Sequence, residues 1–166
     1  MAVFLGDKHR FGVEIGEWVN PLLRRVDLWA ADQWLTCDDN LAFAMQFRLS
    51  VTGTANWLRS GPAPHPPFSG LSPVAAHRRL VGQSADFEEE HRRHEIFHWG
   101  PTTDNLRSFL FRNSKREDEL VITFDFWREE HLLEHPEHAG RVFAAELRTK
   151  EFIGILDELA EVVGPD

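Results

Sequence analysis

The chain has 166 residues, of which 42% are hydrophobic and 27% are charged, a balance typical of one globular domain that builds its own core. Its 27 acidic and 18 basic side chains give a formal net charge of −9, which argues against nucleic acid as a ligand because phosphate binding requires a basic surface. The single cysteine excludes an intramolecular disulfide and a zinc site built on cysteines.

The N-terminus carries no long apolar segment after a basic start, so the sequence indicates no signal peptide. No run approaches the roughly 18 apolar residues of a membrane span. A single cysteine also fits a reducing compartment best. We therefore expect one cytoplasmic domain over residues 1–166, without a membrane contact and without a cofactor.

The N-terminal third alternates between apolar and polar residues, the pattern of strands with one buried face. The alternation predicts strands over residues 2–5, 11–16 and 26–31. A further short apolar segment over residues 34–36 predicts a tight hairpin with the third strand. This hairpin lacks the Asn-Gly or Asp-Gly turn that such connections favour.

Helical spacing follows over residues 40–59, where Asp38 and Asp39 offer N-caps. Residues 60–72 contain four prolines and two glycines and predict a surface loop. Ser72 and Pro73 then fit the cap and first position of a short helix that ends near residue 81. Residues 85–94 predict a helical turn or a mobile loop, and residues 96–99 predict a strand.

The C-terminal part contains the strongest strand signal, the unbroken alternation of Leu120, Ile122, Phe124 and Phe126 with polar neighbours. With the apolar residues 106–111 it predicts an antiparallel hairpin at the centre of the sheet, joined by a polar loop. A polar connector over residues 129–140, a strand over 142–147 and an amphipathic helix capped by Thr149 complete the chain. The order indicates an α+β fold, an antiparallel sheet of about five to seven strands with helices packed on one face.

No motif for phosphate binding, nucleophilic catalysis or dinucleotide binding is present. Two groups of histidines have spacings that zinc sites use. Both lie in heavily charged segments, which favours solvated side chains, and we expect no structural metal and no catalytic residue. The two groups are His91, His94 and His98, and His131, His135 and His138.

Two further candidates for chemistry have simpler structural explanations. Asp38 and Asp39 could form a carboxylate pair for acid–base work, but a helix cap explains both. Cys37 could be a nucleophile, but a lone cysteine in a strand is most often a small apolar residue.

Residues 6–14, Gly-Asp-Lys-His-Arg-Phe-Gly-Val-Glu, resemble the start of bacterial immunity proteins of the immunity protein 42 family, which belong to polymorphic toxin systems. The aromatic hairpin from Leu28 to Leu35, the helix over 40–59 and the C-terminal strands and helix are similar to the parts that follow in that family. The turn without Asn-Gly, the proline-rich loop and the histidine-rich connectors depart from it. The resemblance implies a small inhibitor, not an enzyme, that binds a toxin domain.

We therefore expect a non-catalytic binding protein with a basic partner, most specifically a toxin domain. The expected contact residues are Glu88, Glu89 and Glu90, with Trp29 and Trp34 as buried anchors. The loop 115–119 is a further contact candidate. An enzyme with a metal site at His91, His94 or His131 and a self-associating regulatory domain, such as a homodimer, are the alternatives.

Overall fold

A computed structural model describes residues 2–83 and 85–165 and confirms the α+β class. The strands form two antiparallel sheets, of five and three strands. In the first sheet β1, β2, β3 and β4 lie in sequence order and β5 also pairs with β3. Its strands are β1 (Val3–Asp7), β2 (Phe11–Trp18), β3 (Leu23–Ala30), β4 (Gln33–Trp34) and β5 (Leu41–Phe43).

The second sheet contains the hairpin predicted from residues 106–127. It consists of β6 (Leu106–Arg112), β7 (Glu119–Phe126) and β8 (Phe143–Arg148), with β7 in the middle. Leu106 pairs with Phe126, and β8 pairs with the other edge of β7. Only β7 of the hairpin is central, because β6 forms an edge of the three-stranded sheet, and the hairpin does not join the N-terminal strands.

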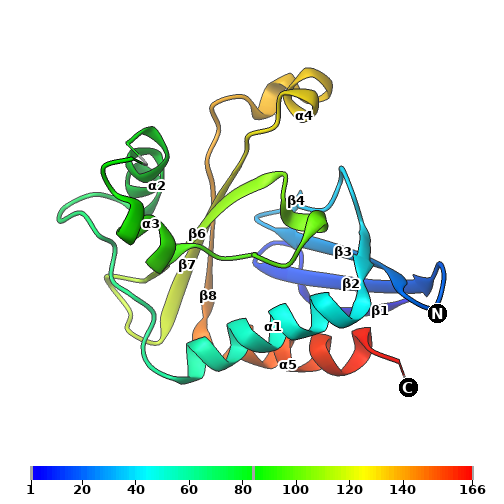
Figure 1. Ribbon diagram of the computed structural model, residues 1–166. Helices are drawn as coiled ribbons and strands as arrows, with labels where there is room; N and C mark the ends of the chain where they lie inside the picture. Colours follow the sequence, from blue (N-terminus) through cyan, green and yellow to red (C-terminus); the bar gives the residue numbers. More distant parts are fainter. Residues whose placement is uncertain (1, 84, 166) are drawn as a thin grey trace.

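Five α-helices surround the sheets: α1 (Ala44–Arg59), α2 (Pro73–Gly82), α3 (Glu88–His94), α4 (Glu129–Glu134) and α5 (Thr149–Val163). Short 3-10 turns cover Pro101–Thr103 and Pro136–His138. Helices α1 and α5 lie side by side at one end of the molecule, whereas α4 stands at the opposite end (Figure 1). None of the helices in the described ranges has the length and apolar character that crossing a membrane requires.

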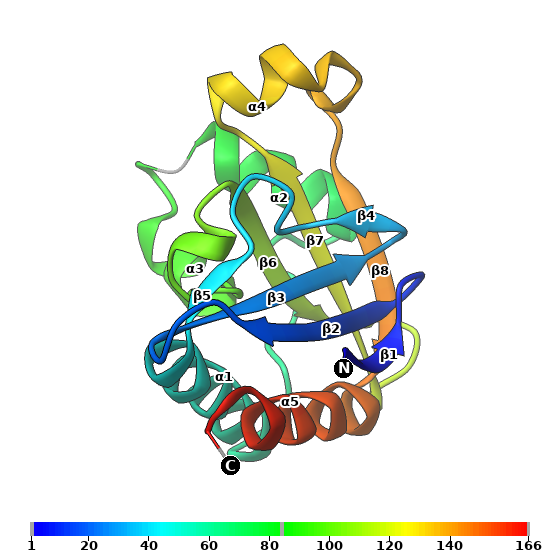
Figure 2. The ribbon, with the colours of Figure 1, turned by 90° about the vertical axis from the view of Figure 1, so that its right-hand side faces the viewer.

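The main core lies where the two sheets face each other. Figure 2 shows β2 and β3 crossing the strands of the second sheet. Apolar residues of β2 and β3, of β7 and β8, and of α1 and α5 form one continuous buried cluster. Leu120, Ile122, Phe124 and Phe126 all face it, as the alternation predicted.

The opposite face of β7 is also covered, although its polar residues suggested solvent. Helix α2 lies on it and buries a second cluster made of Ala76, Leu80, Phe109 and Phe111. His77 makes the polar contacts between α2 and β7, with Thr123 and Asp125.

The contacts of His77 form a buried network. Its Nδ1 lies 2.8 Å from Thr123 Oγ1, and its Nε2 lies 2.7 Å from Asp125 Oδ1. Arg107 donates hydrogen bonds to both oxygens of the same carboxyl group. Burial acts to raise the pKa of Asp125, but hydrogen bonds from His77 and Arg107 outweigh it, so the pKa lies below its ordinary value.

Several predicted helix boundaries are wrong because contacts with distant segments determine where the helices begin. Helix α1 begins at Ala44 and not at residue 40, because residues 41–43 pair with β3 as strand β5. Asp38 and Asp39 therefore cap no helix; Phe43 occupies the N-cap. Thr149 lies inside α5, whose N-cap is Arg148.

Residues 96–99 form no strand; a single bridge between Glu95 and Phe109 replaces it. The region 85–94 contains the helix α3, and the connector 129–140 contains α4. The predicted cap of α2 is confirmed, since Ser72 accepts a hydrogen bond from the backbone N–H of Ala75 and Pro73 opens the helix.

The predicted hairpin between β3 and β4 is confirmed, with an unusual turn. Ala31 and Asp32 both have positive φ, 49° and 62°, the left-handed conformation for which such turns normally use Asn-Gly. The backbone N–H of Asp32 donates to the carbonyl of Lys8, and the side chain of Asp32 lies 2.8 Å from His9 Nδ1. Contacts with the turn at Lys8 and His9 thus stabilise the positive φ angles, which Ala31 and Asp32 do not favour.

Phe124 tests the position of the main core. Its side chain is fully buried and stacks on Phe143 with 5.3 Å between ring centroids. We expect Phe124→Ala to lower the free energy of unfolding by about 3–5 kcal/mol in urea denaturation, because the cavity cannot fully collapse. The matched variant Phe43→Ala, at a half-exposed ring, should lower it by less than about 1 kcal/mol. Equal effects of the two changes would contradict this core.

Candidate functional site

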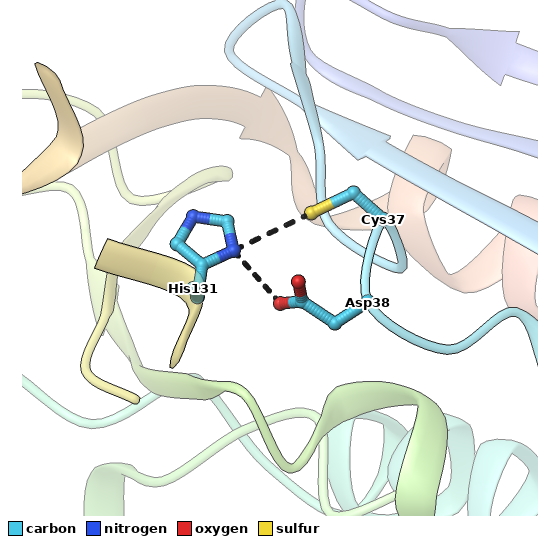
Figure 3. A group of neighbouring side chains, drawn as sticks. All are labelled: Cys37, Asp38 and His131. Carbon is cyan, nitrogen blue, oxygen red and sulfur yellow. Dashed lines mark hydrogen bonds and ion pairs between the residues drawn. The ribbon is translucent and has the colours of Figure 1, made fainter. Parts of the chain in front are cut away.

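A cluster of Cys37, Asp38 and His131 joins two distant parts of the chain. Cys37 and Asp38 lie in the segment between β4 and β5, and His131 lies on α4. Figure 3 shows the imidazole edge of His131 pointing toward both the thiol and the carboxylate. The cluster lies where α4 meets the segment between β4 and β5.

His131 is fixed from several sides. Its Nδ1 lies 2.8 Å from Asp38 Oδ2 and 3.8 Å from Cys37 Sγ, and its Nε2 lies 2.8 Å from His138 Nδ1. The ring stacks on Phe126 with 4.2 Å between centroids and is only 2% exposed. The sequence prediction of a solvated histidine is therefore wrong for His131.

Asp38 is held as firmly. Asn105, at the start of the segment leading into β6, donates from Nδ2 to Asp38 Oδ2 at 2.8 Å and to the carbonyl of Leu35 at 2.9 Å. Asp39 accepts a hydrogen bond from the backbone N–H of Leu41, which shapes the turn into β5. Asp38, which was predicted to cap a helix, thus positions the cluster, and Asp39 positions the turn into β5.

The cluster forms one wall of an open cleft of about 450 Å³, lined by Cys37, Asp38, Arg128, Glu130, His131 and Glu134. Three carboxylates face one guanidinium in this lining. Exposed Asp39 and Glu129 lie beside it in the sequence. In the described part of the chain, the ion pairs of this region involve histidines only, Asp38 with His131 and Glu137 with His135. We call this surface the acidic cleft.

The geometry does not support thiol catalysis. Burial, together with the charge of Asp38, raises the pKa of the Cys37 thiol to about 12, so the reactive thiolate is scarce at neutral pH. Asp38 and Cys37 also approach the same ring nitrogen of His131. In a catalytic triad the carboxylate binds the nitrogen opposite the nucleophile and orients the ring.

His138 extends the cluster on its other side. Burial and the neighbouring His131 lower the pKa of His138 below its ordinary value, so it is predominantly neutral at pH 7. A carboxylate only accepts hydrogen bonds, so His131 Nδ1 carries a proton toward Asp38, and the contact between His131 Nε2 and His138 Nδ1 holds one proton between the two rings. The tautomers of the two rings are thus coupled.

The first histidine group does not converge. Helix α3 ends at His94, so His98 lies outside it, as the sequence predicted. His94 is buried against the carbonyl of Leu110, and burial lowers its pKa. His91 and His98 each pair with Glu95, from opposite ends of that segment.

The acidic residues and tryptophans predicted as a contact surface do not come together. Glu88 and Glu89 form ion pairs with Arg92 and Arg93 of their own helix. Figures 1 and 2 place α3 and the β3–β4 hairpin apart.

The two tryptophans of that hairpin form a pair of their own. Trp29 and Trp34 stack with 5.9 Å between centroids. Lys8 covers Trp29, and Trp34 donates from its indole nitrogen to Asp27. The rings are therefore already engaged within the five-stranded sheet, although Trp34 stays partly exposed.

A second surface feature is an apolar groove of about 320 Å³ between the end of β2 and the start of α1. Trp18, Leu22, Phe43 and Met45 line it, and all four are exposed. Exposed apolar surface of this kind marks contact sites for other proteins.

Sequence reasoning missed the Cys37–Asp38–His131 cluster because its members lie more than 90 positions apart. One local signal pointed to it, the spacing of His131 and His138, which are in contact. No local pattern connects either histidine to Cys37.

The state of Cys37 can be measured by alkylation with iodoacetamide. With a pKa of about 12, the thiolate fraction at pH 8 is on the order of one in ten thousand, against roughly a quarter for a free thiol. We expect alkylation at least about 100-fold slower than that of a free thiol, with a rate that rises as the pH is raised. Asp38→Asn should speed it by removing a negative charge beside the thiol. Rapid alkylation of the native protein at pH 8 would contradict this environment.

The function of the chain is not identified by likeness to known proteins. Searches against protein-family models, curated proteins and solved structures found no match. The resemblance to immunity proteins therefore stays an expectation, and any function is argued from the site itself.

Proposed function

We propose that this protein acts by stoichiometric binding of a basic protein partner, a toxin domain that it neutralises. The observation that carries the proposal is the acidic cleft, in which Glu130 and Glu134 have no ion-pair partner among the described residues and Asp38 pairs only with His131. The net charge of −9 and the resemblance of residues 6–14 to immunity proteins support the same conclusion.

The acidic cleft fits a cationic side chain better than α3 does. On α3, Arg92 and Arg93 already neutralise two of the three glutamates. At the cleft, Glu130 and Glu134 share the lining with one arginine. Unpaired carboxylates retain their full attraction for a lysine or arginine of a partner.

Two exposed apolar side chains lie in α4 or close to it in the sequence. Leu133 of α4 is 77% exposed, and Trp127, which precedes α4, is 47% exposed. Aromatic and apolar anchors surrounded by charged residues are typical of tight protein interfaces. Helix α4 stands at one end of the molecule, which leaves its outer side accessible to a partner (Figure 1).

Co-expression with the toxin domain encoded beside the gene tests the function directly. We expect cells to survive only when this protein is present, and a one-to-one complex to elute on gel filtration. A catalytic inactivation of the toxin would instead act at substoichiometric amounts. Cell death at full expression of this protein, with no complex on gel filtration, would refute the proposal.

Charge reversal identifies the contact surface. Two triple variants change the net charge equally: Glu129, Glu130 and Glu134 to Lys around the cleft, and Glu88, Glu89 and Glu90 to Lys on α3. We expect the cleft variant to lower the association rate about tenfold or more at low salt, because steering by charge acts on association.

The α3 variant serves as the matched control, and circular dichroism verifies that both variants keep the fold. The difference should shrink near physiological ionic strength, where the Debye length is about 8 Å. If the α3 variant lowers the association rate more than the cleft variant does, the partner binds at Glu88, Glu89 and Glu90, as the sequence predicted. An unchanged rate in both variants would exclude a partner steered by these charges.

A further inference from the structure

Three metal-binding atoms of different chemistry converge at the wall of the acidic cleft. Cys37 Sγ, an Asp38 carboxylate oxygen and a His131 ring nitrogen all lie within 4.8 Å of one another. We propose that Cys37, Asp38 and His131 form a zinc site whose fourth position opens into the cleft.

The distance between sulfur and nitrogen is close to that of a tetrahedral zinc site, and the distance between nitrogen and oxygen is shorter. Zn–S bonds of about 2.3 Å and Zn–N bonds of about 2.0–2.1 Å place sulfur and nitrogen about 3.6 Å apart at a tetrahedral angle. Sγ and Nδ1 lie 3.8 Å apart. Nδ1 and Oδ2 lie 2.8 Å apart as a hydrogen bond, and an ion between them requires about 0.5 Å of separation. The exposed Asp38 side chain can supply that movement.

The surroundings of the three atoms match those of ligated residues. Metal-bound histidines donate their other ring N–H to a neighbour, and metal-bound carboxylates accept further hydrogen bonds. Asn105 donates to the Asp38 carboxylate, and His131 Nε2 lies 2.8 Å from His138 Nδ1. With zinc on Nδ1, His131 would carry its proton on Nε2 and donate it to His138 Nδ1, and His138 would carry its own proton on Nε2, so both rings keep their contact.

The donor set selects the class of metal. A thiolate and an imidazole favour zinc and similar transition metals, whereas magnesium and calcium prefer oxygen ligands throughout. Three protein ligands with an open fourth position are the arrangement of zinc sites that take water or an external ligand. A single cysteine excludes a zinc site built on several cysteines, but it allows a site in which one thiol is joined by ligands distant in the sequence.

A nearby second group of His135, Glu137 and His138 also lies within 4.8 Å, but it fits a metal less well. His135 and Glu137 are exposed, at 39% and 59% of their side chains, and His138 Nδ1 is already in contact with His131. This group supplies a control, since His135→Gln leaves the proposed ligands intact.

Cobalt(II), a spectroscopic substitute for zinc, tests the site in the whole protein without any partner. Protein stripped with EDTA under reducing conditions is titrated with Co²⁺ at neutral pH and then with Zn²⁺. We expect one equivalent of Co²⁺ to produce a thiolate-to-cobalt charge-transfer band in the near ultraviolet, together with the visible bands of a four-coordinate site, and one equivalent of Zn²⁺ to abolish both.

The variants assign the ligands. Cys37→Ser should abolish the charge-transfer band, and Asp38→Asn should weaken Co²⁺ binding about tenfold or more. His135→Gln should leave the band and the stoichiometry unchanged. His131→Gln removes a buried ring and can unfold α4, so it is not used as the main test. Cys37 is half-buried, and the decisive variant is therefore Cys37→Ser. Circular dichroism of this variant without metal verifies that it is folded.

Absence of the charge-transfer band, or a band that survives in Cys37→Ser, would overturn the proposal. Loss of binding in His135→Gln with a normal response in Cys37→Ser would move the metal to the second group and would equally overturn it. Because the titration uses no partner protein, its outcome is independent of whether the toxin-binding proposal holds.

Discussion

The burial of β7 on both faces is the constraint on which the rest of the structure depends. One face of the strand completes the core against the five-stranded sheet, and the other lies under α2. A strand buried on both faces must satisfy every polar group internally. Thr123 and Asp125 meet this demand through His77 and Arg107, which ties α2 and β6 to the same strand.

Much of this fold could be predicted from local pattern. The alternation over β7, the amphipathic stripe of α5 and the Ser72–Pro73 helix start are each determined by residues close in the sequence, and the structure confirms them. Such features follow from side-chain periodicity and capping, which act within one or two turns of chain.

The rest depended on contacts between distant segments. Local chemistry cannot tell whether Asp38 caps a helix or binds a histidine, because both roles need only an accepting carboxylate. The polar face of β7 looked solvated because α2, about 40 residues earlier, supplies its partners. The positive φ of Ala31 likewise depends on the neighbouring turn at Lys8. For the same reason the candidate site cannot be recognised in the sequence, because only the fold brings His131 and Cys37 together.

The two proposed properties of the acidic cleft oppose each other. A cation at Asp38 and His131 would reduce the negative charge of the cleft and so weaken its attraction for a basic partner. On these two proposals, binding of the metal would lower the affinity for the partner, and binding of the partner would lower the affinity for the metal by the same factor.

The position of α5 has a consequence for how the chain folds. Arg24 of β3 donates to the carbonyl of Val162, 138 positions away, and Arg59 of α1 pairs with Asp157, 98 positions away. Contacts of α5 thus join segments that are very far apart in the sequence. Bringing such segments together costs conformational entropy, which the contacts offset only once they have formed. The topology has high contact order, and we expect slow folding in which α5 docks late onto strands that paired earlier.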